Sequence, residues 1–201
     1  EDGTQGDILY YGASGAPARL GFGTSGDFLK TQGTGANPAW ASIPAGGLTE
    51  ADCWRLTTGF TGDAAPIASN WERDDSYGFG LLGTGMTESS GIFSFPSTGY
   101  WVVSCFGRWA IAGDDRGMSI ECWVTLNDSA YSRATRGSAF IQQTSGDNTI
   151  ASATATKILD VTDLANIKVQ FRSEVTNSST LTNGSSTINY TYATFMKLGA
   201  T

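Results

Sequence analysis

The chain has 201 residues, of which 40% are hydrophobic and 15% are charged, and its formal net charge is −7. The hydrophobic content predicts a folded core. The acidic balance excludes a general nucleic-acid binder, because phosphate binding needs a surface rich in Lys and Arg. No stretch reaches the ~18 apolar residues of a membrane-spanning helix. Histidine is absent, which excludes His-dependent nucleophilic catalysis and every His-containing zinc site.

Residues 1–46 are rich in Gly, Ala, Ser and Thr and contain an internal repeat. The tetrapeptide GDIL at residues 6–9 recurs as GDFL at residues 26–29. Each copy is a short apolar run followed by a Gly/Pro turn, a unit too small to bury its own apolar face. A collagen helix is excluded because the three-residue glycine grid fails at Leu9, Ala18 and Thr24. A flexible linker is the alternative, but the many large apolar side chains favour an ordered stalk.

The two copies, GDILYYGASGAPARLG and GDFLKTQGTGANPAWASI, resemble the repeats that precede the ends of bacteriophage tail fibres and other virion fibres. This resemblance implies a location at the virion surface and a stalk that contacts other virion proteins. The chain opens on Glu1 without a basic-then-apolar leader, so we expect a fragment or a processed product.

The region 47–201 follows a hinge that we predict at Pro44–Gly47, and its pattern predicts strand after strand. Apolar and polar residues alternate in Ile120–Leu126 and in Ile167–Phe171, as in half-buried strands. The run Tyr100–Trp109 has apolar residues at both odd and even positions, which point to opposite faces of a strand. We therefore expect a central strand with both faces covered. Many short strands joined by turns predict an all-β fold, either a β-sandwich or a jelly roll.

The stretch GIFSFPSTGYWVVSCFGRW resembles the central signature of the globular-head family of complement component 1, subcomponent q. That family shares its jelly roll with tumour necrosis factor. Phe93 and Gly99 have the family's spacing, whereas Trp101 stands where the family usually has Tyr. The resemblance spans residues 53–199. It implies a jelly-roll β-sandwich head that forms a homotrimer and binds proteins or glycans through its loops or outer face.

Large aromatic residues are more numerous than the inner faces of one small sandwich require. Aromatic residues that a core does not use are typical of subunit interfaces, although an aromatic-rich core is the alternative. We therefore predict that the trimer interface contains Trp101, Phe106, Trp109 and Trp123.

The polar residues give weaker signals for chemistry. Paired carboxylates such as Asp114 and Asp115 usually cap turns, so we expect no enzyme; a polysaccharide-degrading enzyme is the alternative. We expect no cofactor, although the Asp114–Asp115 turn could hold calcium through its hard oxygen ligands. Cys105 and Cys122 are expected to be free buried thiols, with a bridge between neighbouring strands as the alternative.

Polar loops that carry aromatic residues are the candidate ligand sites, because aromatic rings stack on the apolar faces of sugars. We predict ligand contacts at Trp71, Tyr77, Arg116 and Tyr131; loops that merely cover the sandwich edges are the alternative. The sequence thus predicts a non-enzymatic virion fibre head that adheres to a host cell-surface receptor or glycan. The alternatives are a structural head fibre, a capsid decoration protein and a secreted lectin-like head.

Overall fold

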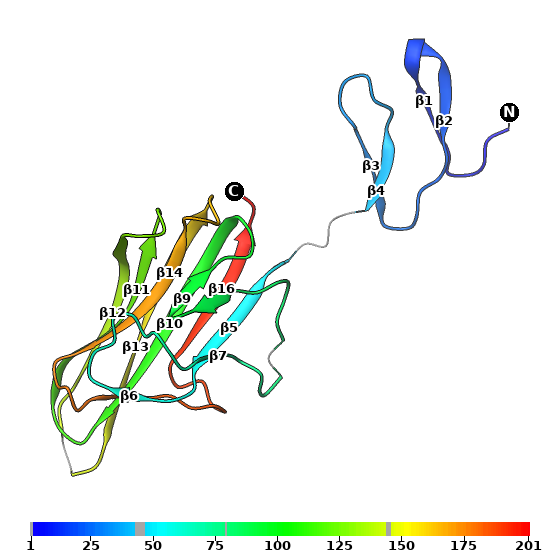
Figure 1. Cartoon of the computed structure of the whole chain (residues 1–201). Coiled ribbons are helices and arrows are strands. Elements are labelled where there is room, and N and C mark those ends of the chain that lie inside the picture. The colour runs from blue at the N-terminus through cyan, green and yellow to red at the C-terminus, as the bar shows by residue number, and fades with distance from the viewer. Residues whose placement is uncertain (1, 43–46, 79, 144–145) are drawn as a thin grey trace. The chain divides into compact units, whose positions relative to one another are not determined.

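The structure is a computed structural model that describes residues 2–42, 47–78, 80–143 and 146–201. The chain divides into two compact units, Glu1–Gly47 and Leu48–Thr201 (Figure 1). Residues 44–46 of the predicted hinge lie outside the described ranges. Within those ranges the regular elements are strands and one 3-10 turn, η1 (Ala13–Gly15). No helix in the described part of the chain is long and apolar enough to cross a membrane.

The N-terminal unit consists of two antiparallel hairpins, β1 (Ile8–Tyr11) with β2 (Pro17–Leu20) and β3 (Asp27–Lys30) with β4 (Ala39–Ser42). The sequence repeat corresponds to one turn that opens each hairpin. The Asp7 carboxylate accepts a hydrogen bond from the Thr4 amide at 2.7 Å, and Asp27 accepts one from Thr24 at 3.0 Å. Residues 2–42 include no buried side chain. The hairpins are therefore ordered by turns and backbone pairing and have no core of their own.

The C-terminal unit is a sandwich of two antiparallel sheets (Figure 1). The first sheet contains, in spatial order, β13 (Thr149–Val161), β10 (Gly99–Ile111), β16 (Tyr192–Gly199), β5 (Ala51–Leu56) and β7 (Trp71–Arg73), with β15 (Leu181–Thr182) and β6 (Phe60–Thr61) continuing from β10. The second contains β12 (Tyr131–Ile141), β11 (Asp115–Thr125), β14 (Lys168–Val175), β9 (Ile92–Ser94) and β8 (Thr87–Ser89). The predicted all-β sandwich is confirmed.

The core lies between the two sheets and is rich in aromatic rings. Phe93 is in ring contact with Phe171 and Phe195, at centroid distances of 5.5 and 5.2 Å. Trp109 donates from Nε1 to the Ser173 hydroxyl at 3.0 Å, so its polar atom is satisfied inside the core. The alternation predicted for residues 120–126 is confirmed in part. Ile120, Cys122 and Val124 face this core, whereas Leu126 is 69% exposed and the polar Glu121 is itself buried.

The predicted central position of Tyr100–Trp109 is confirmed, but within one protomer only one face of this strand is covered by the second sheet. β10 is central in its sheet, between β13 and β16, but its side chains alternate between the core and the outer face. Val103 is buried, whereas Tyr100 is 43% exposed. The apolar residues at the alternate positions, such as Val102 and Phe106, therefore lie on the outer face of the sheet and are partly exposed.

Candidate functional site

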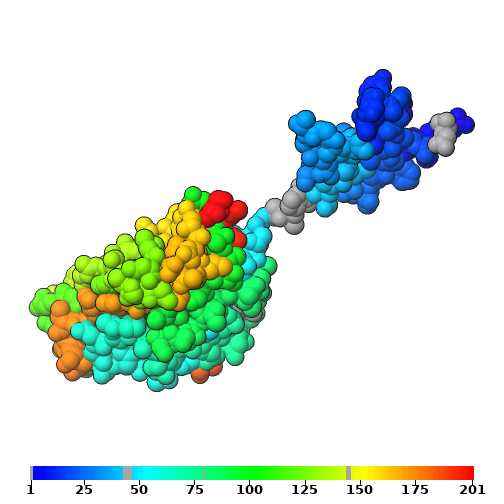
Figure 2. Space-filling view, turned by 45° about the horizontal axis from the view of Figure 1, so that its top comes forward, coloured from blue at the N-terminus to red at the C-terminus, as the bar shows by residue number. Residues whose placement is uncertain are grey.

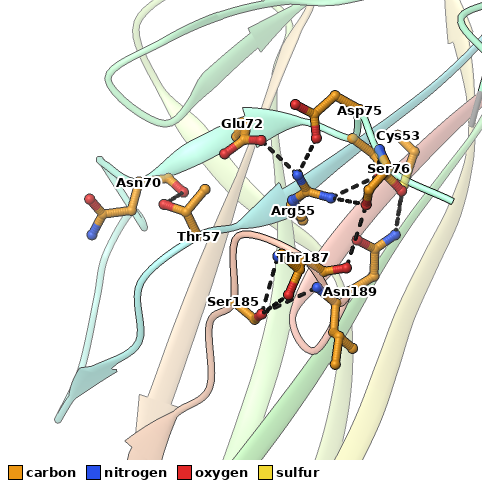
Figure 3. Close-up of polar contacts among 12 residues, drawn as sticks. Cys53, Arg55, Thr57, Asn70, Glu72, Asp75, Ser76, Ser185, Thr187 and Asn189 are labelled. Carbon is orange, nitrogen blue, oxygen red and sulfur yellow. Dashed lines mark hydrogen bonds and ion pairs between the residues drawn. The ribbon is translucent and has the colours of Figure 1, made fainter.

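Arg55 of β5 anchors the loop that follows β7 (Figure 3). Its side chain is 1% exposed and reaches several acceptors at once. Nη1 donates to Asp74 at 2.9 Å and to the Ser76 hydroxyl at 2.6 Å, while Nη2 donates to Glu72 at 2.7 Å and to Asp75. One guanidinium thus holds residues 72–76 against β5. Three carboxylates around one cation leave this cluster with an excess of negative charge.

Asp74 connects this loop to a second one, at residues 185–189. Its Oδ2 accepts a hydrogen bond from Asn189 Nδ2 at 2.7 Å, and the Ser76 hydroxyl lies 3.4 Å from the Thr187 carbonyl oxygen. Burial alone would raise the pKa of Asp74. The hydrogen bonds from Asn189 and Ser76, together with the charge of Arg55, outweigh burial and lower this pKa below its usual value. Asp74 is therefore a fixed anion that ties two loops together.

Tyr77 projects from the end of the anchored loop. It is 88% exposed, and its backbone φ is 53°, a left-handed conformation that side chains other than Asn and Asp rarely adopt. Its ring borders a cavity of about 460 Å³, together with Asp74, Ser76, Ile188 and Asn189. This arrangement presents an aromatic ring beside amide and hydroxyl groups, which suits a ligand that has both apolar and polar faces.

Trp71 does not join this site. Its ring packs edge-on against Phe93 at 5.4 Å, and its Nε1 donates to the Ile67 carbonyl oxygen at 2.8 Å. The indole is therefore committed to the edge of the core, and the structure does not bring it together with Tyr77. No local sequence pattern points to Arg55 or Asn189, because residues more than a hundred positions apart converge here only in the folded chain.

The other two predicted ligand residues, Arg116 and Tyr131, belong to the second sheet. Arg116 is exposed and pairs with Asp114, with Nη2 3.2 Å from Oδ2. The Tyr131 hydroxyl is buried and has no hydrogen-bond partner among the described residues. Burial, with the nearby charge of Asp128, raises its pKa above the usual value. Neither residue lines the cavity beside Tyr77.

Asp114 and Asp115, the predicted alternative calcium ligands, both have partners within the protein: Asp114 accepts a hydrogen bond from the Gln143 amide at 2.6 Å and pairs with Arg116. Asp115 is buried, and its carboxylate accepts hydrogen bonds from Gly117 N at 3.0 Å and from the hydroxyls of Thr176 and Thr180, both at 2.5 Å. Burial alone would raise the pKa of Asp115, but these hydrogen-bond donors outweigh burial, and the pKa lies below its usual value. No group of three or more acidic, Cys or His side chains within the described ranges could hold a metal ion. Asp115 instead fastens the loop after β14 to the start of β11.

Two residues predicted for the trimer interface lie inside the protomer. Trp101 and Trp109 are both on the core parity of β10 and are buried, so they are not available for contact with a second chain. The core of one protomer is large enough to contain both indole rings. Phe106 and Trp123, by contrast, lie on the outer faces of the first and second sheets.

The outer face of the first sheet contains three neighbouring rows without a charge. In the strand registers, Val102 lies between Ile158 and Met196, Ser104 between Thr156 and Thr194, and Phe106 between Thr154 and Tyr192. Phe106 and Tyr192 stack with ring centroids 5.4 Å apart. Charged residues border these rows: Asp160 and Arg108 lie at their two ends, and Arg55 of β5 lies opposite Tyr192 at their side. We call these nine residues the uncharged face.

The carboxylates whose pKa values are shifted are not poised as general acids. Among the described carboxylates, Asp74, Asp115 and Asp163 have shifted pKa values, and each is lowered, whereas a general acid needs a raised one. Burial raises the pKa of Cys53 and Cys122 to about 12. These thiols, with Cys105, are free and buried, so the predicted unbridged state is confirmed.

No protein-family model and no curated protein matches the sequence. Solved structures do match the fold. Eiger TNF from S. frugiperda aligns with a TM-score of 0.57 at 12% identity, over 77% of this chain and 96% of that one. Murine APRIL at pH 8.5 aligns with a TM-score of 0.51 at 11% identity, over 74% of this chain and 98% of that one. The tail-fibre origin of the stalk stays a prediction. The chain has a TNF-like jelly-roll fold.

Proposed function

We propose that the chain is a non-enzymatic, homotrimeric binding head at the surface of a virion, which attaches the particle to a receptor or glycan of the host cell. The N-terminal hairpin repeat serves as the stalk and contacts other virion proteins. A structural head fibre or a capsid decoration protein would use the same architecture without a host ligand.

The observation that carries this proposal is the uncharged face. None of its nine residues is charged, so self-association through this face buries no charged side chain from among them. Burying an unpaired charge is costly when a protein surface is covered. Its centre offers the stacked rings of Phe106 and Tyr192, and aromatic residues are enriched in interface cores. Ile158 and Met196 add exposed apolar side chains on either side of Val102. A second and a third copy of the chain are the occupants that we assign to this face.

Trimer formation gives the weak ligand sites of the head a function. Three copies of one site on a rigid head raise the effective affinity through multivalency, without tight single contacts. The loop that Arg55 anchors keeps Tyr77 projecting into solvent, so it is one such site. No reaction is required of the head.

The solution mass tests the assembly. Size-exclusion chromatography with light scattering should give three times the chain mass of 21.1 kDa. A monomer at micromolar concentration would contradict the proposal, because the uncharged face would then lack its assigned occupants.

Fluorescently labelled protein tests the location of the ligand. Staining of intact bacteria that is competed by unlabelled protein supports host adhesion. Staining confined to empty capsids would overturn adhesion in favour of a decoration role, and release of sugars from envelope polysaccharide would overturn the non-enzymatic assignment.

A further inference from the structure

The outer face of the second sheet gathers arginines around one buried carboxylate. In the strand registers Glu121 of β11 lies opposite Arg136 of β12 on one side and Arg172 of β14 on the other. The next row places Arg133 opposite Trp123. Three guanidinium groups therefore flank β11, two from β12 and one from β14, and neighbouring strands are spaced by about 4.8 Å. Figure 2 shows β11 and β12, in yellow-green, as part of the open surface of this unit.

Glu121 fixes the positions of these arginines. Its side chain is 0% exposed; Oε1 lies 2.8 Å from Arg133 Nη1 and 3.4 Å from Arg136 Nε, while Oε2 accepts a hydrogen bond from Trp123 Nε1 at 2.6 Å. The Arg172 guanidinium stacks on the Trp123 ring, 3.6 Å from its centroid. These contacts orient the guanidinium groups before any ligand arrives, which lowers the entropic cost of binding.

The charge of this cluster is the opposite of the charge of the chain. The three arginines contribute +3, and Glu121 and Glu174, the latter 3.5 Å from Arg136 Nη2, contribute −2, so the cluster has a net charge of +1. The whole chain has a net charge of −7. Arg133 and Arg136 are 45% and 42% exposed at their side chains, so their outer N–H groups remain open to an anion.

A groove beside Arg136 adds an apolar contact. It has a volume of about 250 Å³ and is lined by Arg116, Arg136, Ser138 and Phe140, among others. The Phe140 ring is 67% exposed. On the same face, the Ser119 hydroxyl is buried and has no hydrogen-bond partner among the described residues. The surface therefore combines an exposed aromatic ring with partly exposed guanidinium groups.

We infer that this surface, from Phe140 to Arg133, binds an acidic glycan that carries isolated carboxylates. This inference rests on the proposed adhesion function and names the class of its ligand. The Phe140 ring would contact the apolar face of a sugar, and the guanidinium fork of Arg136 matches a carboxylate in a bidentate pair. A densely charged polyanion fits less well, because Glu174 and Asp114 lie at the rim and the chain as a whole repels it.

The test compares one oligosaccharide in two charge states. Calorimetry of the full chain with oligogalacturonate should show binding that weakens as salt is raised, because partly exposed ion pairs are screened. Methyl esterification neutralises each carboxylate, adds a methyl group to it and leaves the sugar rings unchanged. It should lower the affinity at least tenfold, the usual effect of losing one hydrogen bond to a charged group. Equal binding of the ester would overturn the assignment of a carboxylate ligand.

Variants locate the site on the chain. Arg136→Gln and Phe140→Ser should each lower the affinity for oligogalacturonate about tenfold or more. Lys30→Gln removes the same charge from the N-terminal unit and should leave the affinity unchanged. Each variant must keep the unfolding midpoint of the parent chain. If Arg136→Gln impairs folding, Phe140→Ser still tests the site, because it replaces an exposed ring. Full affinity in Phe140→Ser would overturn this location.

Two further outcomes separate this inference from the proposed function. Tighter binding of heparin or duplex DNA than of oligogalacturonate would overturn the inference that the ligand carries isolated carboxylates. A trimer that stains bacteria but binds none of these probes would overturn the inference and leave adhesion standing. A monomer that still binds oligogalacturonate would support the inference and contradict the trimer.

Discussion

Gly137 of β12 lies directly against the peptide group of Thr154 of β13, at the edge where the two sheets meet. A Cβ at position 137 would overlap the Thr154 carbonyl oxygen and lie 2.9 Å from its amide nitrogen. Because both obstacles are backbone, no side-chain rotation relieves the overlap. Only glycine allows the two strands to close this edge of the sandwich.

Gly137→Ala should therefore lower the free energy of unfolding by about 3 kcal/mol, at the upper end of the usual cost of overpacking. Urea denaturation of the full chain measures this change. Gly113→Ala is the matched control, because a Cβ there would meet only Ile111 at 3.7 Å, and it should be neutral to about 0.5 kcal/mol. An unchanged Gly137→Ala midpoint would mean that β12 and β13 lie farther apart in solution.

Arg55→Gln should destabilise the C-terminal unit by about 3 kcal/mol, because it leaves the nearly buried carboxylate of Asp74 without its cation. The contribution of Asp75 is small, since that side chain is 73% exposed and screened by solvent. Arg116→Gln removes an exposed ion pair and should cost less than about 1 kcal/mol. Comparable losses in the two variants, measured by urea denaturation, would show that Arg55 is not a structural anchor.

Asp115 should contribute to acid unfolding. Because its pKa is lowered in the folded state, its contribution to stability is present above the unfolded value of about 3.9 and is lost as the pH falls through the lower folded value. Asp115→Asn should be less stable than the parent at pH 7, and its stability should fall less steeply below pH ~4. Circular dichroism measures the unfolding of both proteins as the pH is lowered. If their stabilities fell equally steeply below pH ~4, Asp115 would not contribute to acid unfolding.

The three thiols should be unreactive in the folded chain. Burial raises the pKa of Cys53 and Cys122 to about 12, so about one thiol in ten thousand is ionised at pH 8, and burial raises the pKa of Cys105 as well. An aromatic disulfide reagent should release no chromophore from the native protein and three equivalents in guanidinium. Rapid reaction of one thiol without denaturant would reveal local opening of its strand.

Ile158→Lys should dissociate the proposed trimer without unfolding the chain. This side chain is 59% exposed in the protomer, so the substitution disturbs little of the core, but it places a charge within the uncharged face. Light scattering should give the monomer mass at concentrations where the parent is trimeric. Phe140→Lys introduces the same group on the outer face of the other sheet and should leave the mass unchanged. If Ile158→Lys remained trimeric, the uncharged face would not be the trimer interface.

The sequence by itself determined the class of fold and much of its local detail. Alternation in β11 and β14 specified which side chains enter the core, since successive side chains of a strand point to opposite faces. The repeated Gly-Asp pairs at residues 6–7 and 26–27 specified two equal turns, because the aspartate accepts from the backbone three residues earlier. These are short-range consequences of residue type.

Only the tertiary structure decided which long-range partners meet. Trp101 and Trp109 looked like spare aromatic residues, yet both fill the core, because the parity of β10 depends on which of its two apolar faces the second sheet covers. Arg55 finds Asp74, and Glu121 finds Arg136 and Arg172, through strand order and register. Register depends on the hydrophobic patterns of both paired strands and on the turns that join them, so the pattern of one strand alone does not reveal its long-range partners.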